Sequence, residues 1–134
     1  MKLLLVDDDQ ELTSLLEIEL REQGHEVDTA SEGITGVKLA LKNSYDVIVL
    51  DLMLPGIHGH SICKTLRHNH IETPVLMISA LDSVEEIETG FSSGISDYMV
   101  KPFSFEALYQ KIIALNQEFK RHSDHAGPDT YLKN

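Results

Sequence analysis

Short apolar runs alternate with segments of helical periodicity along most of this chain, and the alternation restricts the fold more than any other feature. Four of the five runs are rich in Val, Ile or Leu and have the length of a strand. The runs are Lys2–Val6, Glu26–Thr29, Asp46–Leu50, Pro74–Ile78 and Tyr98–Val100. Between and after them, apolar residues recur three or four positions apart, as on a helix with one buried face.

Five such alternations predict an α/β fold in which a parallel sheet is covered by helices on both faces. Right-handed crossovers then produce a doubly wound sheet whose ligand crevice lies beyond the carboxyl ends of the strands. Gly24 and Gly94 follow two of the helical segments, and Pro74 opens the fourth run, in agreement with these boundaries.

Length and composition limit the functions that this chain can have. The 134 residues provide one domain with a sizeable core, and the net charge of -11 argues against direct nucleic-acid binding. The start of the chain is too short for a secretory signal, and no apolar run approaches the roughly 18 residues of a membrane span. Cys63 is the single cysteine, which excludes an intramolecular disulfide and predicts a packed thiol. We expect a soluble cytoplasmic protein.

Carboxylates follow two of the predicted strands. Asp7, Asp8 and Asp9 come directly after the first run, and Asp51 directly follows the third. A parallel sheet brings these groups to one edge, where they repel one another unless a cation lies among them. An all-oxygen cluster suits a hard divalent ion such as Mg²⁺. The pocket is therefore predicted to serve phosphoryl chemistry.

A turn after Asp51 and two further residues extend this prediction. Asp51 leads through Leu52, Met53 and Leu54 into a Pro55-Gly56 turn, which would hold its carboxylate rigidly for in-line attack on a phosphoryl group. Taken alone, Asp51 is better explained as the cap of a turn. Ser79 and Lys101, which directly follow the fourth and fifth runs, favour the phosphoryl interpretation, because a hydroxyl and an ammonium group both bind phosphoryl oxygens.

Residues 1 to about 120 closely resemble the receiver domain of two-component response regulators. The resemblance is carried by Val6–Asp9, Asp51–Gly56, Ser79-Ala80, and Gly94 with Asp97–Phe103. It implies the flavodoxin-like sheet order 2-1-3-4-5. It also implies that Asp51 accepts a phosphoryl group from a sensor histidine kinase or phosphotransfer protein, and that the domain catalyses only its own phosphorylation and dephosphorylation.

The resemblance assigns further roles. Asp8, Asp51 and the backbone carbonyl of Met53 would ligate Mg²⁺, with Asp7 acting mainly through water. Ser79 and Lys101 would bind the phosphoryl oxygens, and the Lys101-Pro102 bond would be cis. Tyr98 matches the switch aromatic whose ring turns inward when Ser79 moves toward the phosphate. By its position, Asp9 is predicted to cap the first helix rather than bind metal.

The stretch from Asp97 to Leu108 looks most like receivers that precede a winged-helix DNA-binding domain and form homodimers through the fourth helix, fifth strand and fifth helix. The polar residues 121–134 are predicted to form a tail or the start of a linker. Asp97 and Lys111 are candidates for an intersubunit ion pair. Five positions depart from the usual pattern of that interface, and they deplete its polar network: Ile87, Thr89, Ser96, Ala107 and Lys111.

Other functions remain as alternatives. A dehalogenase-type phosphatase, acting as a Mg²⁺-dependent aspartyl-phosphate hydrolase, needs a second acid where this chain has Met53. A flavodoxin-like electron carrier would share the sheet, but Asp7 to Asp9 would repel the phosphate that its first loop must hold. A receiver that has lost phosphorylation and a stand-alone phosphorelay receiver are two further possibilities. The pairs His58/His60 and His68/His70 are predicted to lie about 15 Å apart along the third helix, too far to share a metal ion.

Overall fold

The computed structural model describes residues 1–125 and contains a single five-stranded parallel sheet. The strands lie in the order β2-β1-β3-β4-β5, which confirms the predicted fold. Along the chain the elements are β1 (Lys2–Val6), α1 (Gln10–Glu22), β2 (Glu26–Ala30), α2 (Gly33–Lys42), β3 (Val47–Asp51), α3 (Gly59–His68), β4 (Val75–Ser79), α4 (Val84–Ser92), β5 (Asp97–Val100) and α5 (Phe105–His125).

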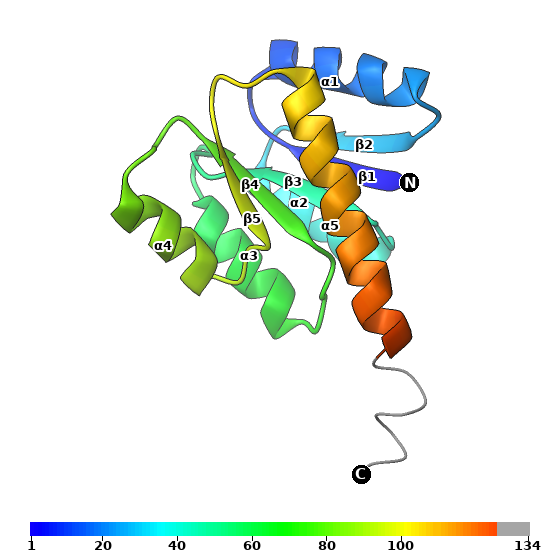
Figure 1. Ribbon diagram of the computed structural model, residues 1–134. Coiled ribbons are helices and arrows are strands. Elements are labelled where there is room, and N and C mark those ends of the chain that lie inside the picture. Colours follow the sequence, from blue (N-terminus) through cyan, green and yellow to red (C-terminus); the bar gives the residue numbers. More distant parts are fainter. Residues whose placement is uncertain (126–134) are drawn as a thin grey trace.

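Helices cover both faces of the sheet, with α1 and α5 together on one face (Figure 1). Alternate residues of each strand enter opposite cores, because side chains along a strand point to alternate faces. In β1, Leu3 and Leu5 pack with residues of α1 and α5. The intervening Leu4 and Val6 pack with residues of α2 and α3. The central strands are therefore buried on both faces, which explains their continuous apolar runs.

Two strands begin and end one residue later than the sequence suggested. The prediction placed Asp46 and Pro74 inside strands, whereas β3 begins at Val47 and β4 at Val75. The Asp46 carboxylate accepts a hydrogen bond from the Lys2 backbone N–H, so this residue ties the strand ends together instead. Pro74 has no N–H to donate to a ladder. As a result Asp51 and Ser79 are the last residues of their strands.

The fifth helix is longer than expected. Residues 121–125 were assigned to a polar tail, but α5 continues through His125. Leu108, Ile112 and Leu115 anchor this helix in the core, and once a helix is nucleated each further residue adds a hydrogen bond at little entropic cost. The rest of the predicted tail, residues 126–134, lies outside the described residues. Within residues 1–125, no helix is long and apolar enough to cross a lipid bilayer.

A strained residue follows α3. His70 is exposed and has a φ of 62°. Its N–H donates to the Arg67 carbonyl, and the Ile71 N–H donates to the Leu66 carbonyl. These two bonds form a helix-ending motif that normally uses glycine at the position of His70. His70→Gly should therefore raise the free energy of unfolding by about 0.5–1 kcal/mol. His68→Gly, two residues earlier at the last position of α3, should lower it by roughly 0.5 kcal/mol. Urea unfolding of both variants tests the pair, and equal losses of stability would contradict the strain argument.

Candidate functional site

Three carboxylates meet at the carboxyl edge of the sheet. Asp7 and Asp8 follow β1, and Asp51 ends the neighbouring strand β3. Asp7 and Asp51 are only 4% and 5% exposed, whereas Asp8 is open to solvent. Each of the three offers a carboxylate oxygen, and these oxygens all lie within 4.8 Å of one another. The predicted convergence of these residues is confirmed.

Lys101 reaches the two buried carboxylates from β5. Its Nζ donates to Asp7 Oδ2 at 2.9 Å and to Asp51 Oδ2 at 3.4 Å. The backbone N–H of Lys101 also bonds to the carbonyl of Ser79, which fixes the point from which the side chain extends. The Lys101-Pro102 peptide is cis, as predicted. The lysine therefore reaches past the ends of β4 and β3 to meet Asp7, which directly follows β1.

The charges of this cluster do not balance. Burial, and then the neighbouring Asp7, raise the pKa of Asp51 from 3.8 to about 6. For Lys101, burial by itself would lower the pKa, but the hydrogen bond to Asp7 and the charge of Asp51 outweigh it and raise the pKa. Three carboxylates thus share one ammonium group, and a divalent cation with a preference for oxygen ligands fits the donor set.

The Asp51 and Asp7 carboxylates are also held by nearby backbone groups. The N–H of Met53 donates to Asp51 Oδ1 at 3.1 Å. The N–H of Asp9 donates to Asp7 Oδ1 at 2.9 Å, so both oxygens of Asp7 are engaged. Met53 is thereby fixed beside Asp51, while the role of its carbonyl as a metal ligand stays a prediction.

Ser79 and Tyr98 converge on one residue of the loop after β4. Ser79 is fully buried, and its Oγ accepts a hydrogen bond from the Leu81 N–H at 3.0 Å. Tyr98 is 8% exposed, and its hydroxyl donates to the Leu81 carbonyl at 2.8 Å. The backbone of Leu81 therefore links the two predicted switch residues. Sequence reasoning missed this link, because a backbone contact leaves no signal in residue type.

Three expectations about other residues are confirmed. Asp9 is the N-cap of α1, where its side chain accepts a hydrogen bond from the Leu12 N–H at 3.1 Å. His58 and His68 lie at opposite ends of α3. Within residues 1–125, the one group of three or more His, Cys, Asp or Glu residues close enough to hold an ion is the aspartate cluster. Cys63 is buried on α3, as predicted.

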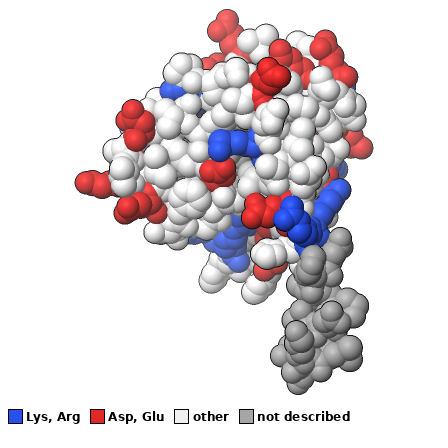
Figure 2. Space-filling view, in the orientation of Figure 1, with Lys and Arg blue, Asp and Glu red and all other residues white. Residues whose placement is uncertain are grey.

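The surface formed by α4, β5 and α5 carries an ion pair within the chain. Lys111 Nζ lies 2.9 Å from Asp97 Oδ2, and both side chains are more than a third exposed. The sequence suggested these two residues as an intersubunit pair, yet each already has its partner in the same molecule. Figure 2 shows acidic side chains gathered over α1 and α4. Dimerisation through this surface remains a prediction.

Comparisons with known proteins agree with the geometry. Residues 3–113 match the family described as response regulator receiver domain. The transcriptional regulatory protein HprR of Escherichia coli is 44% identical over 114 residues, which are 85% of this chain and 51% of HprR. This chain also covers 46% of the transcriptional regulatory protein TcrA of Mycobacterium tuberculosis. The chain spans about half the length of these relatives.

The same likeness appears among solved structures. The receiver domain of the Francisella response regulator 1452 is 38% identical, with a TM-score of 0.84, over 88% of this chain and 98% of that one. The beryllofluoride-activated NtrC4 receiver, solved as a dimer, is 29% identical, with a TM-score of 0.82, over 88% of this chain and 98% of that one.

Proposed function

The chain belongs to the response regulator receiver domain family, and we propose that Asp51 is the residue on which it accepts a phosphoryl group from a partner histidine kinase. The observation that carries this proposal is the position of Asp51. It is buried at the carboxyl edge of the sheet, beside a lysine and within reach of two more aspartates. A carboxylate fixed in this way is placed for in-line attack.

The transfer uses this chain's own groups. A carboxylate oxygen of Asp51 attacks phosphorus, the bond from phosphorus to the kinase histidine breaks, and the imidazole nitrogen keeps the electron pair. Lys101 binds one phosphoryl oxygen and Ser79 donates its hydroxyl to another. Lys101 already points at Asp51, 3.4 Å away, so a small movement of its ammonium group from Asp7 toward the new charge suffices.

Asp8, Asp51 and the Met53 carbonyl are the proposed Mg²⁺ ligands, with Asp7 acting through water. Support for the lesser role of Asp7 comes from its two oxygens, which are occupied by Lys101 and the Asp9 N–H. When bound, Mg²⁺ supplies positive charge that offsets the repulsion between the phosphoryl group and the carboxylates. Few protein ligands and several waters are expected, so binding is expected to be weak.

Incubation with acetyl phosphate tests this function. In Mg²⁺, intact-mass analysis should find one phosphoryl group added to the chain, and excess chelator should prevent the addition. The reason is that the attack brings a dianionic donor toward three carboxylates that one lysine does not neutralise. Equal labelling with and without metal would rule out the proposed site.

Phosphorylation is proposed to act on a two-state loop. When Ser79 turns its hydroxyl toward the phosphoryl group, its bond to the Leu81 N–H is lost, and the Tyr98 bond to the Leu81 carbonyl changes with it. Beryllofluoride, which imitates the acyl phosphate, should therefore shift amide signals from Ala80 to Phe91 and near Tyr98. Tyr98→Phe should remove part of these amide shifts, because it lacks the hydroxyl that bonds to the Leu81 carbonyl. Shifts confined to the neighbourhood of Asp51 would mean that the domain binds phosphate without signalling.

The output is proposed to be transcriptional. HprR and TcrA are named transcriptional regulatory proteins, and this chain matches about half of each. We therefore assign the chain to the N-terminal, regulatory part of a longer regulator that ends in a DNA-binding domain. The acidic receiver itself does not contact DNA, because its net charge of -11 opposes a polyanion. Sequencing the gene beyond residue 134 decides whether a DNA-binding domain follows.

A further inference from the structure

A pocket of about 210 Å³ lies at the edge of the sheet opposite to the aspartate cluster. Its walls come from three segments that are far apart in the sequence. Pro74 and Ser96 directly precede β4 and β5, and the remaining wall is one face of α5. On α5 the lining residues are spaced as on one helical face: Leu115, Glu118, Phe119 and His122. This pocket shares no residue with the proposed phosphoryl site.

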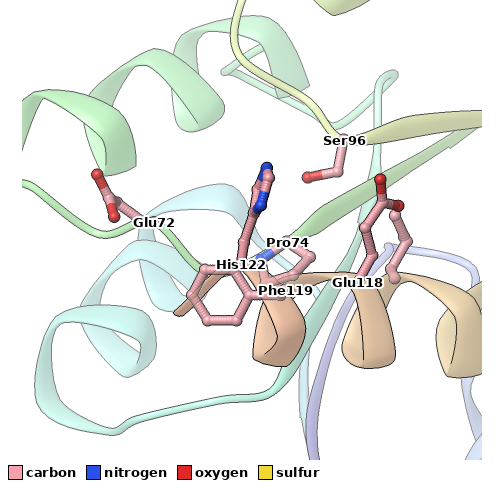
Figure 3. Close-up of a pocket in the computed structure, with 7 residues that line it drawn as sticks. Glu72, Pro74, Ser96, Glu118, Phe119 and His122 are labelled. Carbon is pink, nitrogen blue, oxygen red and sulfur yellow. The ribbon is translucent and has the colours of Figure 1, made fainter. Parts of the chain in front are cut away.

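The pocket combines an apolar floor with an acidic rim. Pro74, Leu115 and Phe119 supply the apolar surface. Figure 3 shows the carboxylates of Glu72 and Glu118 on opposite sides of the pocket. The ion pairs formed within residues 1–125 involve neither glutamate. The rim therefore presents two unneutralised negative charges around a surface that favours an apolar or planar group.

The chemistry of the lining favours a particular cation. A bare metal ion is a poor fit, because the carboxylates and imidazole of this pocket do not form a cluster of three groups within shared coordination distance. An arginine side chain matches better. Its guanidinium plane can stack on the Phe119 ring between the two negative charges of the rim, and its alkyl stem can pack on Pro74 and Leu115.

The source of the arginine follows from charge and chain order. The curated relatives are about twice as long as this chain, and α5, which lines the pocket, is the last element of the receiver. A DNA-binding domain is basic, whereas this chain has a net charge of -11. We infer that the pocket docks an arginine of the DNA-binding half of the longer protein, an inference that rests on the proposed transcriptional role.

The pocket chemistry is tested on this chain with N-acetyl-arginine amide as the probe. Titration at constant ionic strength, followed by amide NMR, should shift the signals of Ser96, Leu115 and Phe119. The neutral isostere N-acetyl-citrulline amide should leave them unchanged. Shifts of equal size with both probes, or arginine shifts that avoid the pocket, would overturn the assignment.

Matched variants test the role of the rim. Glu72→Gln and Glu118→Gln should each weaken arginine binding by about two- to fivefold, the range for exposed ion pairs. Glu88→Gln, an exposed glutamate of α4 that does not line the pocket, should leave it unchanged. All three variants should keep labelling by acetyl phosphate. A failure of labelling in the wild type would thus remove the proposed phosphoacceptor role without affecting the arginine result.

The source is tested in the full-length gene product. Hydrogen exchange at residues 115–119 should be slower there than in this chain, and Glu72→Gln combined with Glu118→Gln should remove the difference. The same exchange rate in both proteins, or a gene that ends at residue 134, would overturn docking within the chain.

Discussion

Replacing Asp51 with asparagine should abolish labelling by acetyl phosphate in Mg²⁺, reducing the rate by a factor on the order of 100 or more. An amide oxygen is neutral and a poor nucleophile, and the change also removes one proposed metal ligand. Labelling is measured by intact mass over a time course. Full labelling of Asp51→Asn would show that another residue is the phosphoacceptor.

The fold itself should survive this substitution. Because the folded protein raises the pKa of Asp51 to about 6, the folded state favours the protonated form, and the ionised carboxylate opposes folding above that pH. A neutral asparagine should therefore make the protein more stable at pH 7, as thermal unfolding can show. Asp9→Asn is the matched control, since asparagine caps a helix as well as aspartate does. It should keep most of the label.

The phosphorylated state should be long-lived. Hydrolysis needs a water in line with the bond between phosphorus and Asp51, and the two flanking positions are proposed to be Met53 and Leu81. Met53 is 52% exposed and Leu81 is partly buried, and neither side chain can orient or activate a water. General acid–base assistance is typically worth about 100-fold, so its absence should be visible in the lifetime.

Decay of the acyl phosphate in Met53→Asn and Leu81→Glu tests this expectation. Each should shorten the lifetime, and Met53→Leu should not. The hydrogen bonds of Ser79 and Tyr98 to Leu81 use only its backbone atoms, so a changed side chain there can leave both bonds in place. Decay at the wild-type rate in both polar variants would mean that these two positions do not control access of water.

Much of this protein was predictable from local patterns. Runs such as Leu3 to Val6 are recognisable as strands because both faces of a parallel sheet are buried, and the order of elements restricts the topology to few arrangements. The convergence of Asp7, Asp8 and Asp51 follows from the same reasoning, since parallel strands end at a common edge. Strand limits were one residue early at Asp46, whose carboxylate accepts a hydrogen bond from the Lys2 N–H, and at Pro74, which has no N–H to donate to a ladder.

Contacts between distant residues were decided by the tertiary structure alone. The bond from Lys101 to Asp7 spans 94 positions and depends on the reach of one side chain past the ends of β4 and β3. The link through Leu81 uses backbone atoms, and the pocket beside Phe119 needs three segments that meet only in the folded chain. The sequence by itself determined which groups stand at each strand end, because periodicity is local. Their partners were determined by packing, which depends on the whole chain.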